Sequence, residues 1–301
     1  MPDLVAVVAS KFSPTVLESL PVIHERKLIV LDAWAAADGI VDNGYKPNYV
    51  FRLSLRDSWA MPAMLAYAKR RGWQQLGVML PHTGWGVSND RALSRHAAKQ
   101  PGVRIIDRRW YDPNAHTIAS KYNTLFAQGA QAILFVGNEP EGAHLVRTIA
   151  QLPAQQRLPV ISHWGITGGN LPEMTGEQLR KINLAVVQTY SFIDAKRPKT
   201  AHVISEAKRL LGVSDARAIP SPVGVAHAYD LVHILALAIE RAGTTDRAAI
   251  RDALEHVENY DGLIKFYRRP FTPDRHEALA EKDVFLARYA VDGALERDTR
   301  R

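Results

Sequence analysis

Residues 73–90 read WQQLGVMLPHTGWGVSND, and this stretch predicts the class of fold. Residues 75–80 form an apolar run with the length of a buried strand, which a proline and two glycines then interrupt, and a helical pattern begins at about Val87. A strand, a turn at its carboxyl end and a helix form the unit of an open parallel sheet, in which ligands sit where strand carboxyl ends meet helix amino ends. Trp85 is expected at that edge, where it either lines a ligand site or closes the top of a core.

The same alternation of strands and helices continues through the first two thirds of the chain. Apolar runs that predict further strands lie at residues 4–9, 28–31, 48–53, 103–107, 130–136, 159–162 and 184–188. Helical patterns lie at residues 14–26, 57–71, 87–99, 117–128 and 139–152. Three helices then follow in succession at 198–211, 222–242 and 246–257, and the last strands are expected at 262–267 and 284–289. Strands that alternate with helices of about a dozen residues indicate a parallel α/β sheet.

Composition narrows the possible classes of protein. The chain has 301 residues, of which 47% are hydrophobic and 23% are charged, as in ordinary globular proteins. The net charge is +7, but the basic residues are interspersed with acidic ones and cluster at expected helix ends, so we expect no nucleic-acid partner. Cysteine is absent, which excludes disulfides and thiolate chemistry. No apolar run approaches the ~20 residues of a membrane span, so we expect no membrane-spanning segment.

The sequence contains none of the common catalytic or cofactor-binding motifs. GxSxG, HExxH, GxxxxGK(S/T) and GxGxxG are all absent. The eleven histidines lie singly along the chain, without the convergent spacing that a metal site requires. We therefore expect that the protein is not an enzyme and that it binds no metal or cofactor. The competing hypothesis is an enzyme built on a doubly wound fold.

Aromatic and polar residues follow the carboxyl ends of several expected strands. These residues are Lys11, Phe12 and Ser13, then Trp34, Trp85, Asn138 and Glu139, and finally Trp164. Since the carboxyl ends of parallel strands lie on one edge of a sheet, these side chains could converge on one ligand. Tryptophan rings stack on flat molecules, while a lysine, a hydroxyl and helix amino ends hold negative charge. The pattern favours a flat anion as ligand, and the alternative is that the tryptophans only seal loops.

Two long runs carry a family resemblance: VAVVASKFSPTVLESLPVIHERKLIVLDAWAAAD at residues 5–38 and YVFRLSLRDSWAMPAMLAYAKRRGWQQLGVMLPHTGWG at residues 49–86. Three later runs fit the same pattern: HWGITGGN at 163–170, PVGVAHAYDLVHILALAIERAG at 222–243 and FLARYAVDG at 285–293. In order and spacing these runs are similar to the type I periplasmic solute-binding proteins, and among them to the leucine/isoleucine/valine-binding receptors of ABC transporters. The resemblance covers nearly the whole chain.

The resemblance implies an α/β fold of two doubly wound parallel-sheet lobes, which are joined by three crossovers and close on a small ligand in the cleft between them. It assigns residues 1–55 and 195–257 to the first lobe, and residues 56–194 and 258–301 to the second. Family members carry a signal peptide and two further strand–helix units before the segment that starts here at Leu4. The first lobe is therefore expected to be incomplete.

The resemblance also assigns ligand-binding positions. In the family, a turn rich in Ser and Thr holds the ligand carboxylate; it matches Lys11-Phe12-Ser13, in which Ser13 supplies the hydroxyl and can also cap the helix that starts at Pro14. The second loop of the first lobe matches Trp34-Ala35-Ala36. An aromatic residue on the second lobe matches Trp85.

One position departs from the family pattern. The acidic residue that holds the α-amino group of an amino-acid ligand falls here at Trp164, so that carboxylate is missing. Glu139, which follows Asn138 on a different loop, could replace it. Because a buried ammonium group without a partner is costly, we expect an aromatic or branched carboxylate, held between Trp34 on the first lobe and Trp85 and Trp164 on the second.

By this resemblance the chain is expected to be the periplasmic solute-binding receptor of an ABC-type importer. It would capture a small organic acid or an amino acid and deliver it to a membrane permease. The alternative is a ligand-sensing module of the same fold in a signalling or regulatory system.

Overall fold

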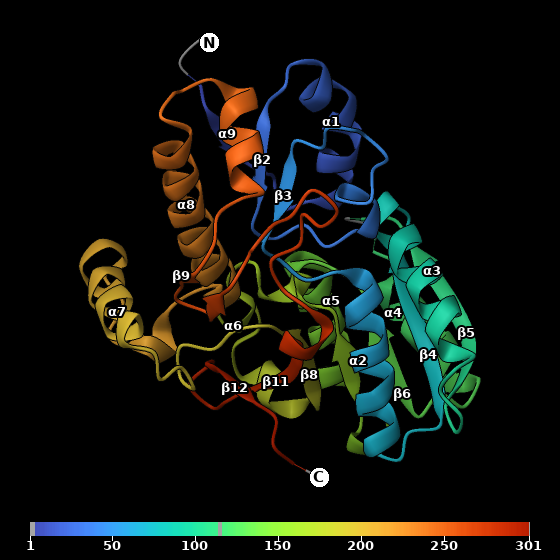
Figure 1. Cartoon of the computed structure of the whole chain (residues 1–301). Helices are drawn as coiled ribbons and strands as arrows, with labels where there is room; N and C mark the ends of the chain where they lie inside the picture. The colour runs from blue at the N-terminus through green and yellow to red at the C-terminus, as the bar shows by residue number, and fades with distance from the viewer. Residues whose placement is uncertain (1–3, 114–115, 301) are drawn as a thin grey trace.

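The computed structural model describes residues 4–113 and 116–300, which form two lobes with a separate main sheet in each (Figure 1). The sheet of the first lobe is parallel and has three strands in the order β1 (Ala6–Val8), β2 (Ile29–Asp32) and β3 (Val50–Arg52). Helix α1 (Ser13–Glu25) connects β1 to β2. Every residue of β2 and β3 is buried, as the continuous apolar runs of the sequence predict for strands covered on both faces.

The sheet of the second lobe has seven strands in the order β12-β11-β8-β7-β6-β4-β5. Its strands are β4 (Gln75–Pro81), β5 (Arg104–Tyr111), β6 (Ala132–Phe135), β7 (Val160–Ser162), β8 (Leu184–Gln188), β11 (Phe285–Tyr289) and β12 (Leu295–Arg297). The strands from β4 to β8 are parallel, whereas β11 pairs antiparallel with both β8 and β12. The predicted α/β fold with two parallel-sheet lobes is therefore confirmed.

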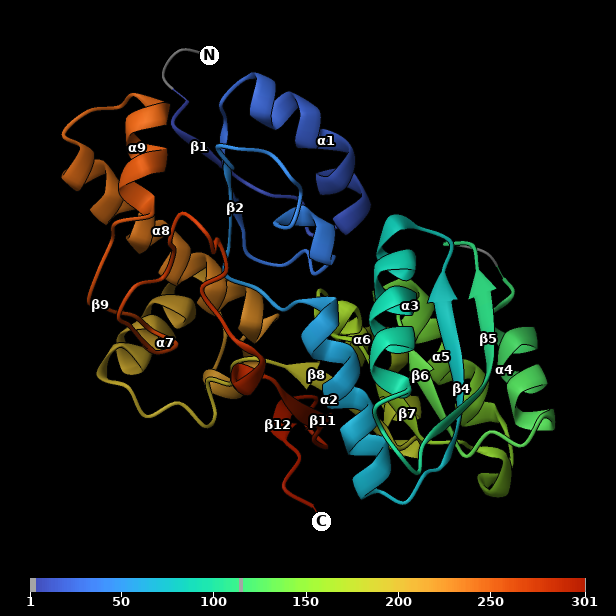
Figure 2. The same cartoon turned by 45° about the vertical axis from the view of Figure 1, so that its right-hand side comes forward.

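Helices cover both faces of the large sheet, which makes it doubly wound (Figure 2). The helices α2 (Asp57–Arg70) and α3 (Gly84–Ala97) pack together, as do α4 (Ile118–Ala127) and α5 (Glu139–Gln151). The short α6 (Leu171–Thr175) follows β7 and contacts α5. The last three helices are α7 (Pro198–Leu211), α8 (Pro222–Ala242) and α9 (Arg247–Leu254), of which α8 and α9 pack beside the small sheet (Figure 1).

Helix α3 begins at Gly84, earlier than the expected start at Val87. The Thr83 hydroxyl caps the helix by accepting a hydrogen bond from the Gly86 amide (3.2 Å). A Cβ atom at position 86 would lie 1.9 Å from the Pro81 carbonyl oxygen, so only glycine fits this close approach of the helix to β4. The glycine that suggests an interruption in the sequence is thus a packing requirement of the first turn. This start places Trp85 inside the helix.

The segment after α9 also differs from the sequence-based expectation. Instead of one strand at 262–267, two short antiparallel strands form, β9 (Tyr260–Asp261) and β10 (Phe266–Tyr267). Residues 276–278 then pair with β3: the Arg52 amide donates to His276 O (2.8 Å) and the Ala278 amide to Arg52 O (2.9 Å). This part of 258–301 therefore lies with the small sheet, away from the lobe to which the sequence-based division gave it. The other lobe boundaries stay a prediction.

By length and composition alone, α8 could cross a membrane, contrary to the expectation from the sequence. Its buried residues recur at helical spacing along one face, which is typical of a core helix. That face also carries the polar side chains of His227 and Asp230, which are fully buried and hydrogen-bonded within the protein. This face of α8 therefore belongs to the interior of the protein.

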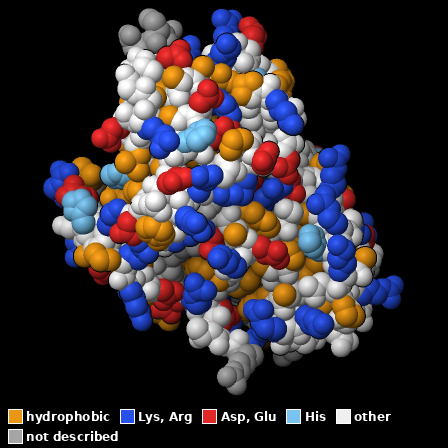
Figure 3. Space-filling view, in the orientation of Figure 1, with side chains coloured by type: hydrophobic (Ala, Val, Ile, Leu, Met, Phe, Trp, Pro, Cys, Tyr) orange, Lys and Arg blue, Asp and Glu red, His pale blue; other side chains and the backbone are white. Residues whose placement is uncertain are grey.

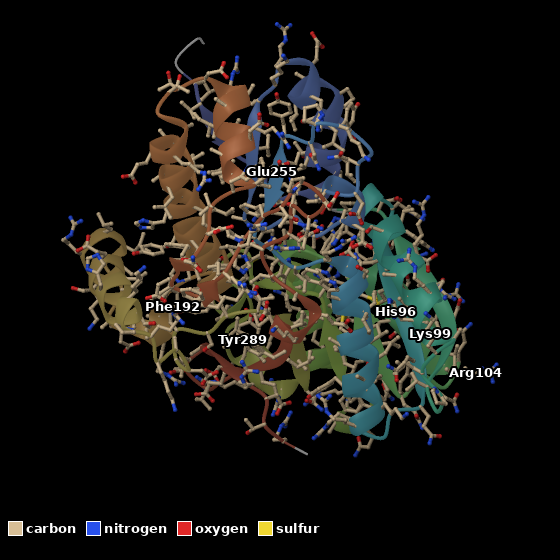
Figure 4. The ribbon with its side chains drawn as sticks, viewed as in Figure 1. His96, Lys99, Arg104, Phe192, Glu255 and Tyr289 are labelled. Atoms are coloured by element: carbon tan, nitrogen blue, oxygen red, sulfur yellow. The ribbon has the colours of Figure 1, made fainter. Side chains whose placement is uncertain are left out.

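The positive charge is concentrated in one part of the chain, although basic and acidic residues are interspersed elsewhere. Residues 90–109, in α3 and β5, contain six Lys or Arg and only two Asp, which accounts for more than half of the net charge of +7. Figure 3 shows a column of Lys and Arg side chains on the right-hand flank, and in Figure 4 Arg104 lies at the outer edge of the molecule. Arg91, Arg95, Lys99 and Arg104 are all exposed. The excess positive charge therefore lies on the outside of the second lobe.

Candidate functional site

A cavity of about 460 Å³ opens between the two lobes. This volume falls in the range of small-molecule sites, about 300–1,000 Å³. Of the residues predicted from the sequence to bind a ligand, those that line the cavity are Lys11, Phe12, Ser13, Trp34, Ala36, Trp85, Asn138, Glu139 and Trp164. They come from the ends of β1, β2, β4, β6 and β7, so the edge rule for parallel strands correctly brings them together. Their contact with a ligand stays a prediction.

Ala35 is the predicted site residue that lies outside the cavity lining among the described residues. Its amide donates to Asp32 Oδ1 (2.8 Å) and its carbonyl accepts from Arg52 Nη1 (3.3 Å). Only 1% of Ala35 is exposed. Ala35 therefore serves the loop behind Trp34 and is not placed to touch a ligand.

Ser13 holds the loop that carries Trp34. It is the first residue of α1 and makes no side-chain cap, contrary to the expectation from the Ser-Pro sequence. Its hydroxyl oxygen accepts from the amides of Ala36 and Ala37, at 3.2 Å each. Since both lone pairs of the oxygen face these donors, the hydroxyl hydrogen is the part of Ser13 that can still be given to a ligand.

Trp34 of the first lobe stacks directly on Trp164 of the second, with ring centroids 5.1 Å apart and an angle of 25° between the planes. A flat ligand between them would require a separation of about 7 Å, twice the usual contact distance. The expectation that a ligand lies between these two rings is therefore not met in this state of the protein. The stacked pair forms one wall of the cavity instead.

Two glycines fix Trp34 in this position. A Cβ atom at Gly168 would lie 3.1 Å from Trp34 Cζ2, and one at Gly224, on α8, would lie 3.1 Å from Trp34 Cε3. The indole of the first lobe thus fits closely against backbone from two other segments. Trp34 consequently connects its loop, α8 and the second lobe.

A buried carboxylate lies beneath the cavity. Asp57 Oδ1 accepts from Trp85 Nε1 (3.1 Å) and from His163 Nε2 (3.0 Å), and both Asp57 and His163 are fully buried. His163 Nδ1 accepts from the Trp164 amide (2.9 Å), so Nε2 carries the ring hydrogen in the neutral tautomer. Burial raises the pKa of Asp57, and the hydrogen bond from His163 partly offsets this.

The charges that line the cavity are Lys11, Glu139 and Glu141. Lys11 Nζ lies 2.8 Å from Glu139 Oε1, so its positive charge is already paired. The side chain of Glu139 is only 8% exposed and belongs to the first turn of α5. The excess positive charge of the molecule is therefore not at the cavity, and Glu139, which the sequence offered as a replacement for the missing carboxylate, lines it.

His227 of α8 connects the first lobe to the segment that leaves β8. Its Nδ1 donates to Ala33 O (2.9 Å), and its Nε2 accepts from the Thr189 hydroxyl (2.9 Å). The imidazole also contacts Trp164, with ring centroids 5.6 Å apart. Burial lowers the pKa of His227 to about 4, so the ring is neutral at pH 7.

The sequence pattern missed Tyr111, Asn170 and Met174, which also line the cavity. Tyr111 ends β5, where its hydroxyl donates to Val136 O (2.5 Å). The expected strand at 103–107 stopped too early to place this residue at the sheet edge. Asn170 precedes the short helix α6 and Met174 lies in it, and the elements predicted from the sequence include no helix at this place.

Among the described residues, no group of three or more His, Asp or Glu is arranged to hold a metal ion. Trp85, Trp34 and Trp164 together with the paired charges give a cavity that suits a small organic molecule with an apolar part.

The sequence matches a family model described as "Periplasmic binding protein" over residues 3–294. No curated protein matches the chain in sequence.

Solved structures show the same fold. A type 1 periplasmic binding protein from Bordetella pertussis Tohama I has a TM-score of 0.85 and 21% identity, over 98% of this chain and 81% of that one. A leucine binding protein from Thermotoga maritima has a TM-score of 0.80 and 20% identity, over 98% and 79%. An ABC-transporter solute binding protein from Rhodopseudomonas palustris, in complex with 4-hydroxybenzoate, has a TM-score of 0.78 and 16% identity, over 97% and 76%.

Proposed function

Because this chain belongs to the periplasmic binding protein family, a family of solute-binding proteins, we propose that it is the receptor of an ABC-type importer. It captures a small organic acid or an amino acid in the cavity between its lobes and passes it to a membrane permease. On this proposal the protein acts in the periplasm. The observation that carries the proposal is a cavity to which both lobes contribute tryptophans and one ion pair, Lys11–Glu139.

The apolar part of the ligand contacts aromatic walls. Trp85 and the stacked Trp34 and Trp164 supply large surfaces that suit a branched or aromatic group. Two of the structural neighbours are named for such ligands, leucine in one and 4-hydroxybenzoate in the other. The proposed ligand therefore combines an aromatic or branched body with a carboxylate.

The charged part of the ligand meets Lys11, Ser13 and Glu139. A carboxylate can accept from the Ser13 hydroxyl and from Lys11, whose ammonium group has three donors and can hold Glu139 at the same time. If the ligand also carries an ammonium group, Glu139 gains a new partner; if it does not, Glu139 shares Lys11 with the ligand carboxylate. Glu139 is therefore the residue that distinguishes an amino acid from a simple organic acid.

The test is a binding screen of the full chain by thermal shift and calorimetry. The panel pairs leucine, valine and phenylalanine with the acids that lack the amino group, 4-methyl-2-oxopentanoate, 3-methyl-2-oxobutanoate and benzoate. We expect at least one member to bind, and we expect Trp85→Ala to remove that binding. A second lining variant, Glu139→Gln, should weaken amino acids selectively. If no small acid or amino acid binds, or if Trp85→Ala leaves binding intact, the proposed site is wrong.

A further inference from the structure

We propose that Asp57 is a positioning residue that holds the three tryptophans of the cleft in their working geometry. The inference rests on the proposed function, in which Trp34, Trp85 and Trp164 form the ligand-contacting walls. Asp57 itself does not line the cavity among the described residues, and it is fully buried. It acts through the groups to which it is hydrogen-bonded.

Asp57 occupies the junction between the lobes. It is the first residue of α2, immediately after the chain leaves the small sheet through residues 53–56. Its backbone amide donates to Ala36 O (3.0 Å), in the loop that carries Trp34. The main chain of Asp57 therefore fixes the first-lobe wall relative to the start of the second lobe.

The carboxylate of Asp57 fixes the second-lobe walls. Oδ1 accepts from Trp85 Nε1 (3.1 Å), which orients the indole on the first turn of α3. The same oxygen accepts from His163 Nε2 (3.0 Å). One oxygen atom thus holds two side chains at a fixed separation, one from the first turn of α3 and one from the residue that follows β7.

His163 transmits the position of Asp57 to the third wall. The residue after it is Trp164, whose amide donates to His163 Nδ1 (2.9 Å). The His163 ring also packs edge-on against Trp85, with centroids 5.0 Å apart and planes at 90°. Because both ring nitrogens are engaged, a shift of Asp57 moves the imidazole and with it the start of the segment that carries Trp164.

The choice of a carboxylate at this place is informative. Burying a charged side chain is costly unless its hydrogen bonds are satisfied, and an apolar residue would fill the same volume at lower cost. Asp57 accepts with Oδ1 from Trp85 and from the histidine next to Trp164, whereas its Oδ2 is buried without a hydrogen-bond partner among the described residues. Its contribution is therefore better explained by the orientation of the aromatic walls than by packing alone.

The experiment compares Asp57→Leu with Asp57→Asn in the full chain. Leucine has a similar size but no acceptor, whereas asparagine keeps an oxygen that can receive both donors. The readout is the set of indole N–H signals in ¹⁵N NMR spectra of the ligand-free protein, with each signal assigned by a Trp→Phe variant. The chain has six tryptophans, and Trp73, which contacts Tyr67 near the far end of α2, reports on the overall fold.

For Asp57→Leu we expect the Trp85 and Trp164 signals to shift and the Trp85 N–H to exchange with solvent at least tenfold faster, while the Trp73 signal stays in place. For Asp57→Asn we expect both signals and the slow exchange to be retained. His163→Phe should shift the Trp164 signal and leave the Trp85 N–H protected, because the bond from Trp85 to Asp57 does not pass through His163. If Asp57→Leu does not fold, the comparison of His163→Phe with Asp57→Asn still tests whether Asp57 contacts Trp85 directly and reaches Trp164 through His163.

Unchanged Trp85 and Trp164 signals in Asp57→Leu would overturn the inference, as would a loss of Trp85 protection in His163→Phe. Affinities for leucine and for 4-hydroxybenzoate are measured on the same variants, and whichever probe binds should bind at least tenfold more weakly to Asp57→Leu. If neither probe binds the unaltered protein, the ligand assignment fails, while the NMR signals still decide the role of Asp57.

Discussion

Lys11 Nζ and Glu139 Oε1 lie 2.8 Å apart and join the two lobes across the mouth of the cavity. Lys11 belongs to the turn between β1 and α1, whereas Glu139 opens α5 on the second lobe. The Lys11 side chain is 41% exposed, so water screens the pair and its contribution is at most about 1 kcal/mol. Such a contact can bias the lobes toward each other without preventing them from separating.

Breaking this pair should make the ligand-free protein more open. For Glu139→Gln we expect a larger radius of gyration by small-angle X-ray scattering at low salt, with the difference shrinking as salt rises. The exchange Lys11→Glu with Glu139→Lys should restore the original radius. Equal radii for the single variant and the unaltered protein at low salt would show that the pair does not contribute to closure.

Ser13→Ala should cost both stability and affinity. The change removes the acceptor of the Ala36 and Ala37 amides, and buried donors left without a partner cost about 1–3 kcal/mol. If the hydroxyl also donates to a ligand carboxylate, binding weakens by about 1 kcal/mol or more. Denaturant unfolding and calorimetry measure the two effects separately. Ser19→Ala, at an exposed hydroxyl on the same helix, is the control and should change neither.

The neutral state of His227 predicts a loss of stability in acid. Its pKa is about 4 in the folded protein, against about 6.5 in an unfolded chain. Between these values the unfolded chain binds the extra proton, so stability from this group falls as the pH drops from about 6.5 to about 4, by about 3 kcal/mol in all.

Asp32 changes stability with pH in the opposite direction, because burial raises its pKa to about 7 and the folded protein then binds the extra proton. To cancel this contribution, the measurement is the difference in unfolding free energy between the unaltered protein and His227→Gln across this range of pH. Glutamine can donate to Ala33 O and accept from Thr189 without titrating. A difference that does not change with pH would contradict a neutral, buried His227.

Gly86→Ala should destabilise the second lobe by about 1–3 kcal/mol, the usual cost of overpacking. The new methyl group would lie 1.9 Å from the Pro81 carbonyl oxygen, so the start of α3 has to move away from β4. Gly39→Ala is a matched control, since its nearest neighbour would be Leu17 Cδ2 at an ordinary 3.5 Å. Thermal unfolding of the two variants should differ clearly, and similar melting temperatures would contradict the close approach.

Much of the fold follows from local sequence signals. The bounds of β8, α7 and α8 match their expected ranges because apolar runs and prolines mark them clearly. The start of α3 was placed too late, since local sequence gives no sign that Gly86 is required by contact with Pro81. The pairing of residues 276–278 with β3 was also missed, because strand partners far apart in the chain leave no mark in a local pattern.

The sequence predicts which residues lie together at the site, but it does not predict which of them contact each other. Strand ends correctly indicated which residues meet, yet the pairing of Lys11 with Glu139 joins residues 128 positions apart. Asp57 carries no sequence signal, because an aspartate at a helix start has an ordinary explanation in the helix dipole. Its role depends on Trp85 and His163, which only the tertiary structure brings to the same oxygen.

The pairing of residues 276–278 with β3 has a consequence for how the protein folds. Arg52 and Glu277 form a fully buried bidentate pair, with Nε–Oε2 at 3.0 Å, between residues 225 positions apart. The small sheet therefore reaches its final pairing only after the chain has passed through the other lobe and returned. Contacts of such long range slow folding and couple distant segments, so the two lobes should unfold in one cooperative step rather than as separate units.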